Sequence, residues 1–254
     1  RLLMKFTVNR AAFIKSLTDV QRAISTKTTI PILTGVKLKL EAKGLTLTGS
    51  DADVSIETFI AADDDNAELQ IEKTGQIVLT ARIFSEIVKK LPETTLTFEV
   101  TENYQTEITS GSASLTIKGL DADNYPRLPE IDAEEQLTFK GDLLKQLIGQ
   151  TVIAVSTQES RPILTGVHLV IKQGELLAVA TDSHRLSQRK IALPETQNAN
   201  YDIIIPGRSL NELAKMIPEE TDAVSLRISE NQVLFDLGNT TFYSRLLEGN
   251  YPDT

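Results

Sequence analysis

Apolar and polar residues alternate along much of the chain, which is the pattern of β-strands that bury one face. In residues 36–40 and again in 45–47, aliphatic residues alternate with Lys or Thr, and Lys43-Gly44 separate the two runs. This arrangement predicts an antiparallel hairpin. Further strands are predicted at 4–8, 53–60, 67–72, 76–80, 95–101, 105–110 and 113–118.

Other stretches carry apolar residues at helical spacing. Phe13, Leu17 and Val20 share one helical face, so we predict a helix over 10–24 with Asn9 as its N-cap. Similar patterns predict helices over 81–91, 141–155 and 208–217. The chain therefore combines antiparallel strands with a few amphipathic helices.

The hexapeptide Pro-Ile-Leu-Thr-Gly-Val occurs twice, at Pro31–Val36 and at Pro162–Val167, 131 residues apart. An ungapped alignment extends over 31–55 and 162–186, and nine of its 25 pairs are identical. This period exceeds the roughly 20–50 residues of a solenoid repeat, so it indicates a duplicated domain. We predict a first domain over 4–126, a linker over 127–135 and a second domain over 136–252.

The later part of each copy repeats surface residues as well. The helix predicted over 81–91 matches that over 208–217 at an offset of 126, including two basic residues and one acidic residue. Asn124-Tyr125-Pro126 reappears as Asn250-Tyr251-Pro252. Because the first tripeptide leads into a linker and a further domain, we expect a third copy that is absent from this chain.

Composition limits the classes of function. The 254 residues include no cysteine, which excludes disulfides and thiolate sites and suits a reducing cytoplasm. No apolar run approaches the ~18 residues that cross a bilayer, so no membrane association is expected. Phosphate-binding glycine motifs do not occur, and the acidic groups at Asp51/Asp53 and Asp63–Asp65 fall in solvated turns. We therefore expect no cofactor and no metal.

The formal charge of −9 is unevenly distributed. The predicted helices, counted over 9–24, 81–91, 141–155 and 208–217, together carry +5, and the rest of the chain carries −14. Gathered on one surface, these helices would offer phosphates a positive track without reading bases. The alternative is an ordinary solvated face on each helix. The helix residues that would contact DNA are Arg10, Lys15, Arg22, Arg82, Lys89, Arg208 and Lys215.

The segment Thr181-Asp182-Ser183-His184-Arg185 contains the residue types of a catalytic triad. Such a triad requires the three side chains to converge, with the histidine between the other two. Adjacent residues of an extended segment point to opposite faces. An esterase-like hydrolase using Ser183 and His184 is thus the least favoured interpretation, and no catalytic residue is predicted.

Three segments carry a specific resemblance to a known family: Arg161–Val167, Ala180–Leu186 and Glu248–Asp253. In these residues the chain resembles the bacterial DNA polymerase III beta subunits, the sliding clamps. The resemblance covers essentially everything from Met4 onward, and the sequence is most similar in character to the Gram-positive members of the family. The resemblance implies an α+β fold of duplicated clamp domains, each with antiparallel sheets outside and two helices on the inner face. It also implies a closed ring of two subunits arranged head to tail, each with three such domains.

The resemblance further implies a processivity factor in the cytoplasm and not an enzyme. Such a protein encircles double-stranded DNA without reading its sequence and keeps its partners close to the template. The implied partners are the replicative DNA polymerase, the clamp loader and repair proteins, which dock through short peptide motifs. The remaining alternative is a peptide-binding or scaffold module that kept the clamp fold without encircling DNA.

Site residues follow from the resemblance by position. Lys27 falls in the DNA-contacting loop of the first domain, and Gln158 and Arg161 fall in the equivalent loop of the second. Leu115 and Ile117 fall on the strand that pairs with the neighbouring subunit. The second-domain wall of the peptide pocket would comprise Leu164, Thr181, Ser183, His184, Arg185, Leu186 and Pro252.

Overall fold

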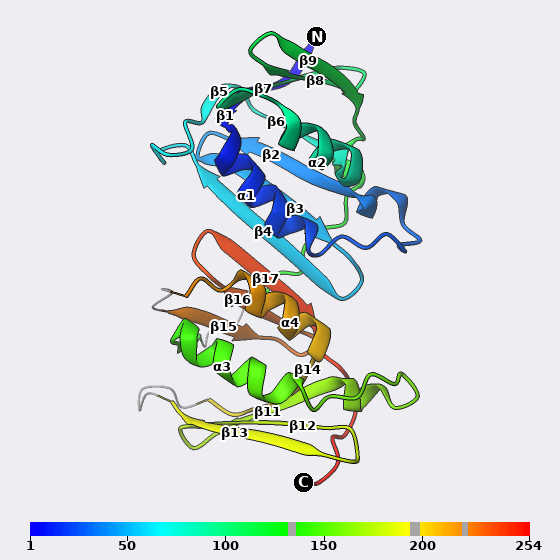
Figure 1. Cartoon of the computed structure of the whole chain (residues 1–254), viewed down its shortest axis with the longest axis vertical. Coiled ribbons are helices and arrows are strands. Elements are labelled where there is room, and N and C mark those ends of the chain that lie inside the picture. Colours follow the sequence, from blue (N-terminus) through cyan, green and yellow to red (C-terminus); the bar gives the residue numbers. More distant parts are fainter. Residues whose placement is uncertain (132–135, 194–198, 220–222) are drawn as a thin grey trace. The chain divides into compact units, whose positions relative to one another are not determined.

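The computed structural model describes residues 1–131, 136–193, 199–219 and 223–254. The chain divides into two compact units, Arg1–Leu128 and Pro129–Thr254, and each contains helices and antiparallel strands (Figure 1). The α+β class predicted from the sequence is therefore confirmed. Residues 132–135 of the predicted linker lie outside the described residues.

The first unit contains two groups of antiparallel strands. One is a sheet in the order β5-β1-β7-β8-β9, with bounds β1 (Leu2–Asn9), β5 (Gln70–Lys73), β7 (Thr95–Thr101), β8 (Gln105–Ser110) and β9 (Ala113–Lys118). In the other, β2 pairs with β6 and β3, and β3 pairs with β4. The bounds of this group are β2 (Gly35–Glu41), β3 (Gly44–Ser50), β4 (Val54–Ala61) and β6 (Gly75–Thr80).

The predicted hairpin is confirmed as β2 and β3. Its register places Leu40 opposite Leu45, and both side chains are buried. Gly44 follows the turn with a φ of +154°, and a Cβ there would lie 2.3 Å from the backbone oxygen of Ile60. Only glycine fits this position, as the predicted turn at Lys43-Gly44 requires.

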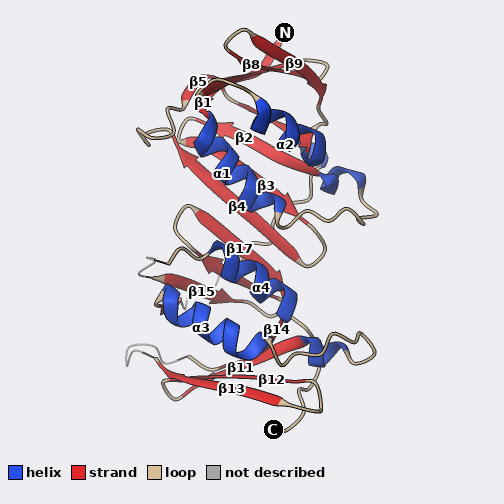
Figure 2. Ribbon diagram, viewed as in Figure 1, coloured by secondary structure: helices blue, strands red, loops and turns tan. Residues whose placement is uncertain are grey.

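Two helices, α1 (Arg10–Gln21) and α2 (Ala81–Lys90), pack against each other and against the strands of the first unit (Figure 2). The Asn9 side chain accepts a hydrogen bond from the Ala12 N–H at 3.0 Å, which confirms the predicted N-cap. Four aromatic rings form part of the core, with centroids 4.7 to 5.9 Å apart: Phe6, Phe13, Phe84 and Phe98. The helices are thus fixed by apolar packing.

Strand β3 approaches the end of α1 closely at Gly49. A Cβ at this position would lie 2.2 Å from the Val20 carbonyl oxygen and 3.2 Å from Cγ1 of Ile24. The absence of a side chain therefore sets how near the helix can lie to the strand.

The second unit repeats this arrangement. One sheet has the order β13-β12-β11-β14, with bounds β11 (Gly166–Lys172), β12 (Glu175–Thr181), β13 (Leu186–Ala192) and β14 (Tyr201–Pro206). The remaining strands pair in sequence order and are β10 (Leu137–Phe139), β15 (Val224–Ile228), β16 (Gln232–Asp236) and β17 (Thr240–Arg245). Helices α3 (Gly141–Val152) and α4 (Gly207–Met216) pack against each other (Figure 2).

Each copy of the hexapeptide forms a short helical turn and then the first residues of a strand. Pro31–Thr34 and Pro162–Thr165 form short 3₁₀ helices, and the strands start at the glycines that follow. In each copy the threonine hydroxyl donates to the proline carbonyl, at 2.7 and 2.6 Å. Proline at the first helical position and this local hydrogen bond stabilise the turn.

Two helices end earlier than predicted, because α1 stops at Gln21 instead of 24 and α3 stops at Val152 instead of 155. After each helix the backbone forms hydrogen bonds between residues three apart, as in a 3₁₀ turn. The Ala23 N–H donates to the Val20 carbonyl at 3.1 Å, and the Ala154 N–H donates to the Thr151 carbonyl at 3.0 Å. The apolar spacing continues through these tighter turns, so it overestimates the length of the α-helix.

Candidate functional site

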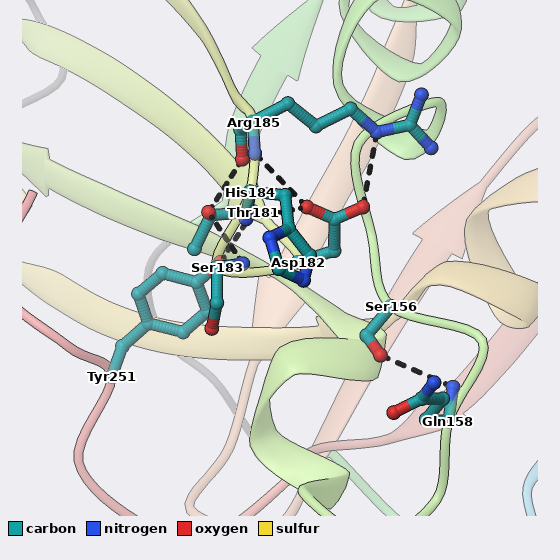
Figure 3. Close-up of polar contacts among 8 residues, drawn as sticks. All are labelled: Ser156, Gln158, Thr181, Asp182, Ser183, His184, Arg185 and Tyr251. Carbon is teal, nitrogen blue, oxygen red and sulfur yellow. Dashed lines mark hydrogen bonds and ion pairs between the residues drawn. The ribbon is translucent and has the colours of Figure 1, made fainter.

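Three candidate residues of the second unit, Ser183, His184 and Arg185, lie in the turn 182–185 between β12 and β13 (Figure 3). Asp182 organises this turn, because its Oδ1 accepts the backbone N–H groups of His184 and Arg185 at 2.9 and 3.0 Å. Its Oδ2 accepts from Nε of Arg185 at 3.1 Å. Hydrogen bonds from the His184 and Arg185 backbone, together with the Arg185 charge, lower the pKa of Asp182. The ionised carboxylate therefore holds the turn.

Ser183 adopts a glycine-like backbone within this turn, with a φ of +78°. Its N–H donates to Oγ1 of Thr181 at 3.2 Å, and that hydroxyl donates to the Arg185 carbonyl at 2.6 Å. Arg161 reaches the turn from its own loop, where Nη1 donates to Oγ of Ser183 at 3.1 Å. A residue predicted to contact DNA is thereby joined to a residue predicted to line the peptide pocket.

Tyr251 ties the repeated Asn-Tyr-Pro segment to the same turn. Its hydroxyl accepts the backbone N–H of Thr181 at 2.9 Å (Figure 3). Burial raises the pKa of Tyr251, so the phenol stays neutral at physiological pH. Pro252, the next residue, is half-buried. The end of β12 and the segment that contains Pro252 are thus connected by a specific hydrogen bond.

The predicted pocket residues differ in exposure. Ser183, His184 and Arg185 are exposed, and the Leu186 side chain has an exposed fraction of 50%. Leu164 is only 2% exposed and packs in the core of its unit. The accessible part of this surface therefore consists of polar groups beside one open leucine.

The side chains of Asp182, Ser183 and His184 do not form a catalytic relay. Asp182 contacts the backbone of His184, and Oγ of Ser183 accepts from Arg161. A triad needs the histidine ring between the acid and the nucleophile. The hydrolase interpretation therefore has no support in this geometry.

The two loops predicted to contact DNA share one local structure. The Lys27 N–H donates to Oγ of Ser25, and the Gln158 N–H donates to Oγ of Ser156, both at 3.1 Å. The serines occupy equivalent positions in the two copies, so the duplication extends to these turns. Lys27, Gln158 and Arg161 are all exposed.

Among the predicted helix cations, Arg10 contacts the end of the other helix of its unit. The Arg10 guanidinium donates to the carbonyl groups of Lys89 and Glu93 at 3.2 and 3.1 Å, where α2 ends. In the second unit, Nζ of Lys145 donates similarly to the Ile217 carbonyl at 3.4 Å, where α4 ends. These contacts satisfy terminal carbonyl groups and join the two helices of each unit.

The other predicted helix cations are exposed: Lys15, Arg22, Arg82, Lys89, Arg208 and Lys215. Arg82 and Arg208 each stand second in their helix, and the first turns of α2 and α4 contain no acidic residue. Lys215 also forms an ion pair with Glu212 at 3.2 Å. These six side chains supply positive charge to the helix surfaces of the two units.

Leu115 and Ile117 lie on β9, the last strand in the order of its sheet. They pair with Ile108 and Thr106 of β8 and are half-buried on one face. A strand in this position carries backbone groups that can pair with a further strand.

Within residues 1–131, 136–193, 199–219 and 223–254, no three His, Asp or Glu side chains are placed to hold a metal ion. Asp51 accepts the N–H groups of Asp53 and Val54, both at 2.7 Å, and so forms the first-copy equivalent of the Asp182 turn. The same ranges contain no helix that is both long and apolar enough to cross a membrane.

Sequence reasoning assigns no role at the site to Asp182 or Tyr251, although both are repeated, as Asp51 and Tyr125. Asp182 is identical to Asp51 in the first copy, and aspartate commonly stabilises turns through its side chain. These two facts could have identified Asp182 as the residue that holds the turn. The role of Tyr251 depends on a partner 70 residues earlier in the chain, which no local pattern reveals.

Family comparison agrees with this two-unit architecture. Residues 4–129 match the family model of the N-terminal domain of the DNA polymerase III beta subunit, and residues 138–253 match that of the central domain. The chain is 51% identical to the Beta sliding clamp of Bacillus subtilis over 252 residues, which cover 99% of this chain and 67% of that protein. It thus spans about two thirds of the length of the curated relatives that it matches.

Solved structures show the same relationship. The crystal structure of the DNA polymerase sliding clamp from Bacillus subtilis superposes with a TM-score of 0.96 at 51% identity, covering 99% of this chain and 66% of that one. The sliding clamp from Pseudomonas aeruginosa bound to griselimycin superposes with a TM-score of 0.89 at 29% identity, covering 98% of this chain and 66% of that one. The predicted clamp fold and the predicted family are confirmed, and the chain belongs to the DNA polymerase III beta subunits, the bacterial sliding clamps.

Proposed function

We propose that the protein is a processivity factor that encircles duplex DNA and tethers the replicative polymerase. The observation that carries this proposal is the 51% identity to a sliding clamp, maintained along 99% of the chain with both domain models in order. The complete ring would consist of two subunits head to tail, each with a third domain. It would act in the cytoplasm by enclosing the DNA in its ring, without catalysing a reaction on DNA.

The exposed cations support sequence-independent contact with DNA. Lys27 and Gln158 occupy matching turns, and the helix cations add charge to a chain whose overall charge is −9. Contacts of this kind reach phosphates and carry no base specificity. Because each exposed contact is weak and screened by salt, the protein could slide while the ring prevents escape.

We expect the protein with its complete natural chain, loaded on circular duplex DNA, to remain bound for as long as the circle is intact. A single cut should release it at least tenfold faster, because an end lets the ring slide off. Gel filtration of the DNA before and after cleavage measures retention, and a circle without the cleavage site, treated identically, is the control. Equal release from cut and uncut circles would favour the alternative, a scaffold module with the clamp fold.

The turn 182–185 supports a peptide-docking role for the second domain. The exposed Arg185 ends this turn and the exposed Leu186 begins β13, so the segment offers a peptide one charged and one apolar side chain. We propose that peptides of the polymerase, the clamp loader and repair proteins dock here, with Thr181, Ser183, His184 and Pro252 completing this wall. Leu164 would support the wall from the core.

Removing the Arg185 side chain should weaken ligand binding about fivefold, because one charge-assisted contact at a partly solvated site is lost. Griselimycin, which the Pseudomonas relative binds, serves as the probe in a calorimetric titration of the complete natural chain. Lys190→Ala is the matched control, since Lys190 is an exposed cation on β13, the strand that follows the turn, and it pairs with Glu175 at 3.8 Å. An Arg185→Ala variant with unchanged affinity would place the pocket elsewhere.

We also propose that β9 forms the subunit contact of the ring through Leu115 and Ile117. Its position at the end of the sheet order in the first unit supports this assignment, because an edge strand can be extended by a strand of another subunit. The domain division 4–126 and 136–252 belongs to the same proposal.

A further inference from the structure

His168 stands at the centre of a chain of contacts that reaches the candidate pocket. It lies on β11, and its Nε2 is 2.6 Å from Oδ1 of Asp202 on the neighbouring strand β14. The imidazole ring also stacks on the ring of Tyr251, with centroids 4.8 Å apart and planes inclined by 25°. The Tyr251 hydroxyl in turn accepts the N–H of Thr181. The side chains of Asp202, His168 and Tyr251 thus connect β14 to Thr181, the last residue of β12 before the turn 182–185.

The local geometry leaves the imidazole little freedom. The His168 side chain is 18% exposed, held at one nitrogen by a carboxylate and over one face by a phenol ring. Stacked rings at this separation attract each other beyond simple burial, and a hydrogen bond to a carboxylate fixes the ring orientation. The tyrosine is consequently held by its ring, which leaves its hydroxyl directed at the Thr181 amide.

The first unit contains the equivalent pair in a different setting. Lys37 is 131 residues before His168, and Tyr125 is 126 residues before Tyr251. Nζ of Lys37 lies 6.0 Å from the centroid of the Tyr125 ring, a cation–π arrangement. Both units therefore place a strand side chain against the tyrosine of Asn-Tyr-Pro. This contact holds the Asn-Tyr-Pro segment against the strand in each unit.

The two tyrosines differ in what their hydroxyl groups do. Tyr125 is 4% exposed and packs in a buried cluster with Leu33, Val78 and Ala122. Its hydroxyl has no hydrogen-bond partner among the described residues. The hydroxyl of Tyr251 instead binds the Thr181 amide. Only in the second unit does the anchor act on a turn that is proposed to bind a ligand.

We propose that His168, oriented by Asp202, is a positioning residue of the peptide pocket. It acts through Tyr251 on two parts of the wall: the Thr181 end of β12 and the segment that contains Pro252. The proposal rests on the proposed docking role of this surface, and it predicts that the stacked ring matters more than the charge of the imidazole.

The test compares His168→Ala with His168→Phe, which retains an aromatic ring for stacking, in the complete natural chain. His168→Ala should weaken griselimycin binding about fivefold and speed deuterium exchange of the Thr181 amide by a similar factor, as expected for loss of one hydrogen bond. His168→Phe should restore most of both values. Lys37→Ala is the matched control, because it removes the equivalent contact in the first unit and should change neither.

Two readouts separate this proposal from the docking role itself. If the wild-type protein does not bind griselimycin, the docking proposal fails for this probe, while Thr181 exchange still decides whether His168 positions the turn. Wild-type exchange and affinity in His168→Ala would overturn the positioning role. Failure of His168→Phe to restore either value would overturn the stacking argument, and Tyr251→Phe, which keeps the ring and removes the hydroxyl, should reproduce the fast Thr181 exchange.

Discussion

Replacing Gly49 with alanine is expected to lower the free energy of unfolding of the first unit by about 3 kcal/mol. The new Cβ would lie 2.2 Å from the Val20 carbonyl oxygen, a backbone atom that can move only with the end of α1. The variant must therefore displace the helix from β3 or distort the strand, and either response disturbs the packed core. Urea denaturation followed by circular dichroism measures the change.

Gly149→Ala provides the matched control in the other unit. Gly149 lies within α3, and a Cβ there would meet no atom within 4 Å. Alanine favours the helix by about 1 kcal/mol relative to glycine, so this variant should be slightly more stable than wild type. A similar loss of stability in both variants would show that the close approach at Gly49 does not determine the packing of α1.

The largest effect at the candidate site is expected for Asp182→Ala, which should weaken griselimycin binding at least tenfold. The substitution removes the acceptor of two backbone N–H groups and the ionic partner of Arg185 at once. The turn then loses the contacts that present its exposed residues. Asp182→Asn keeps a neutral acceptor at the same place, so its affinity should fall between those of alanine and wild type.

Asp51→Ala is the control for this prediction, because Asp51 makes the same pair of backbone contacts in the first unit. It should disturb the equivalent turn and leave griselimycin affinity unchanged. If Asp51→Ala and Asp182→Ala reduce affinity equally, the effect reflects general loss of stability. If Asp182→Ala binds as wild type, the turn is not part of the pocket.

The lowered pKa of Asp182 also gives the turn a defined pH dependence. A carboxyl whose folded-state pKa lies below its ordinary value of 3.8 contributes stability that is fully present above that value. The contribution is lost as the pH falls through the lowered pKa. Affinity should therefore not change with pH on account of Asp182 between about pH 5 and pH 8, because this range lies roughly one unit or more above the usual carboxyl pKa and the group stays ionised throughout.

Local patterns in the sequence were sufficient for most of the elements. The strands predicted at 95–101, 105–110 and 113–118 are confirmed, because β7, β8 and β9 have those bounds. The short strand predicted at 67–72 instead begins at Gln70, because Ala67 and Leu69 are buried in the preceding loop. Apolar residues that are buried in a loop give the same sequence pattern as apolar residues in a strand, so the predicted strand is too long at its start.

The site was predictable to the extent that it lies in repeated segments. The equivalence of Lys27 with Gln158 follows from the duplication, and their turns are formed by equivalent serines. The contact of Arg10 with the Lys89 carbonyl spans 79 positions, and that of Arg161 with Ser183 spans 22. Such contacts depend on tertiary packing, so the charge of a residue in the sequence does not reveal which group it will meet.

Arg82 and Arg208 place positive charge where the partial charge of the helix dipole is already positive. An acidic residue in either first turn would stabilise the helix by about 0.3–1 kcal/mol, and the first turns of α2 and α4 contain none. Selection for stability alone would favour the acidic residue at both places. The proposed contact with DNA gives a reason for the repeated arginines, because they raise the positive potential that attracts phosphates at the expense of some helix stability.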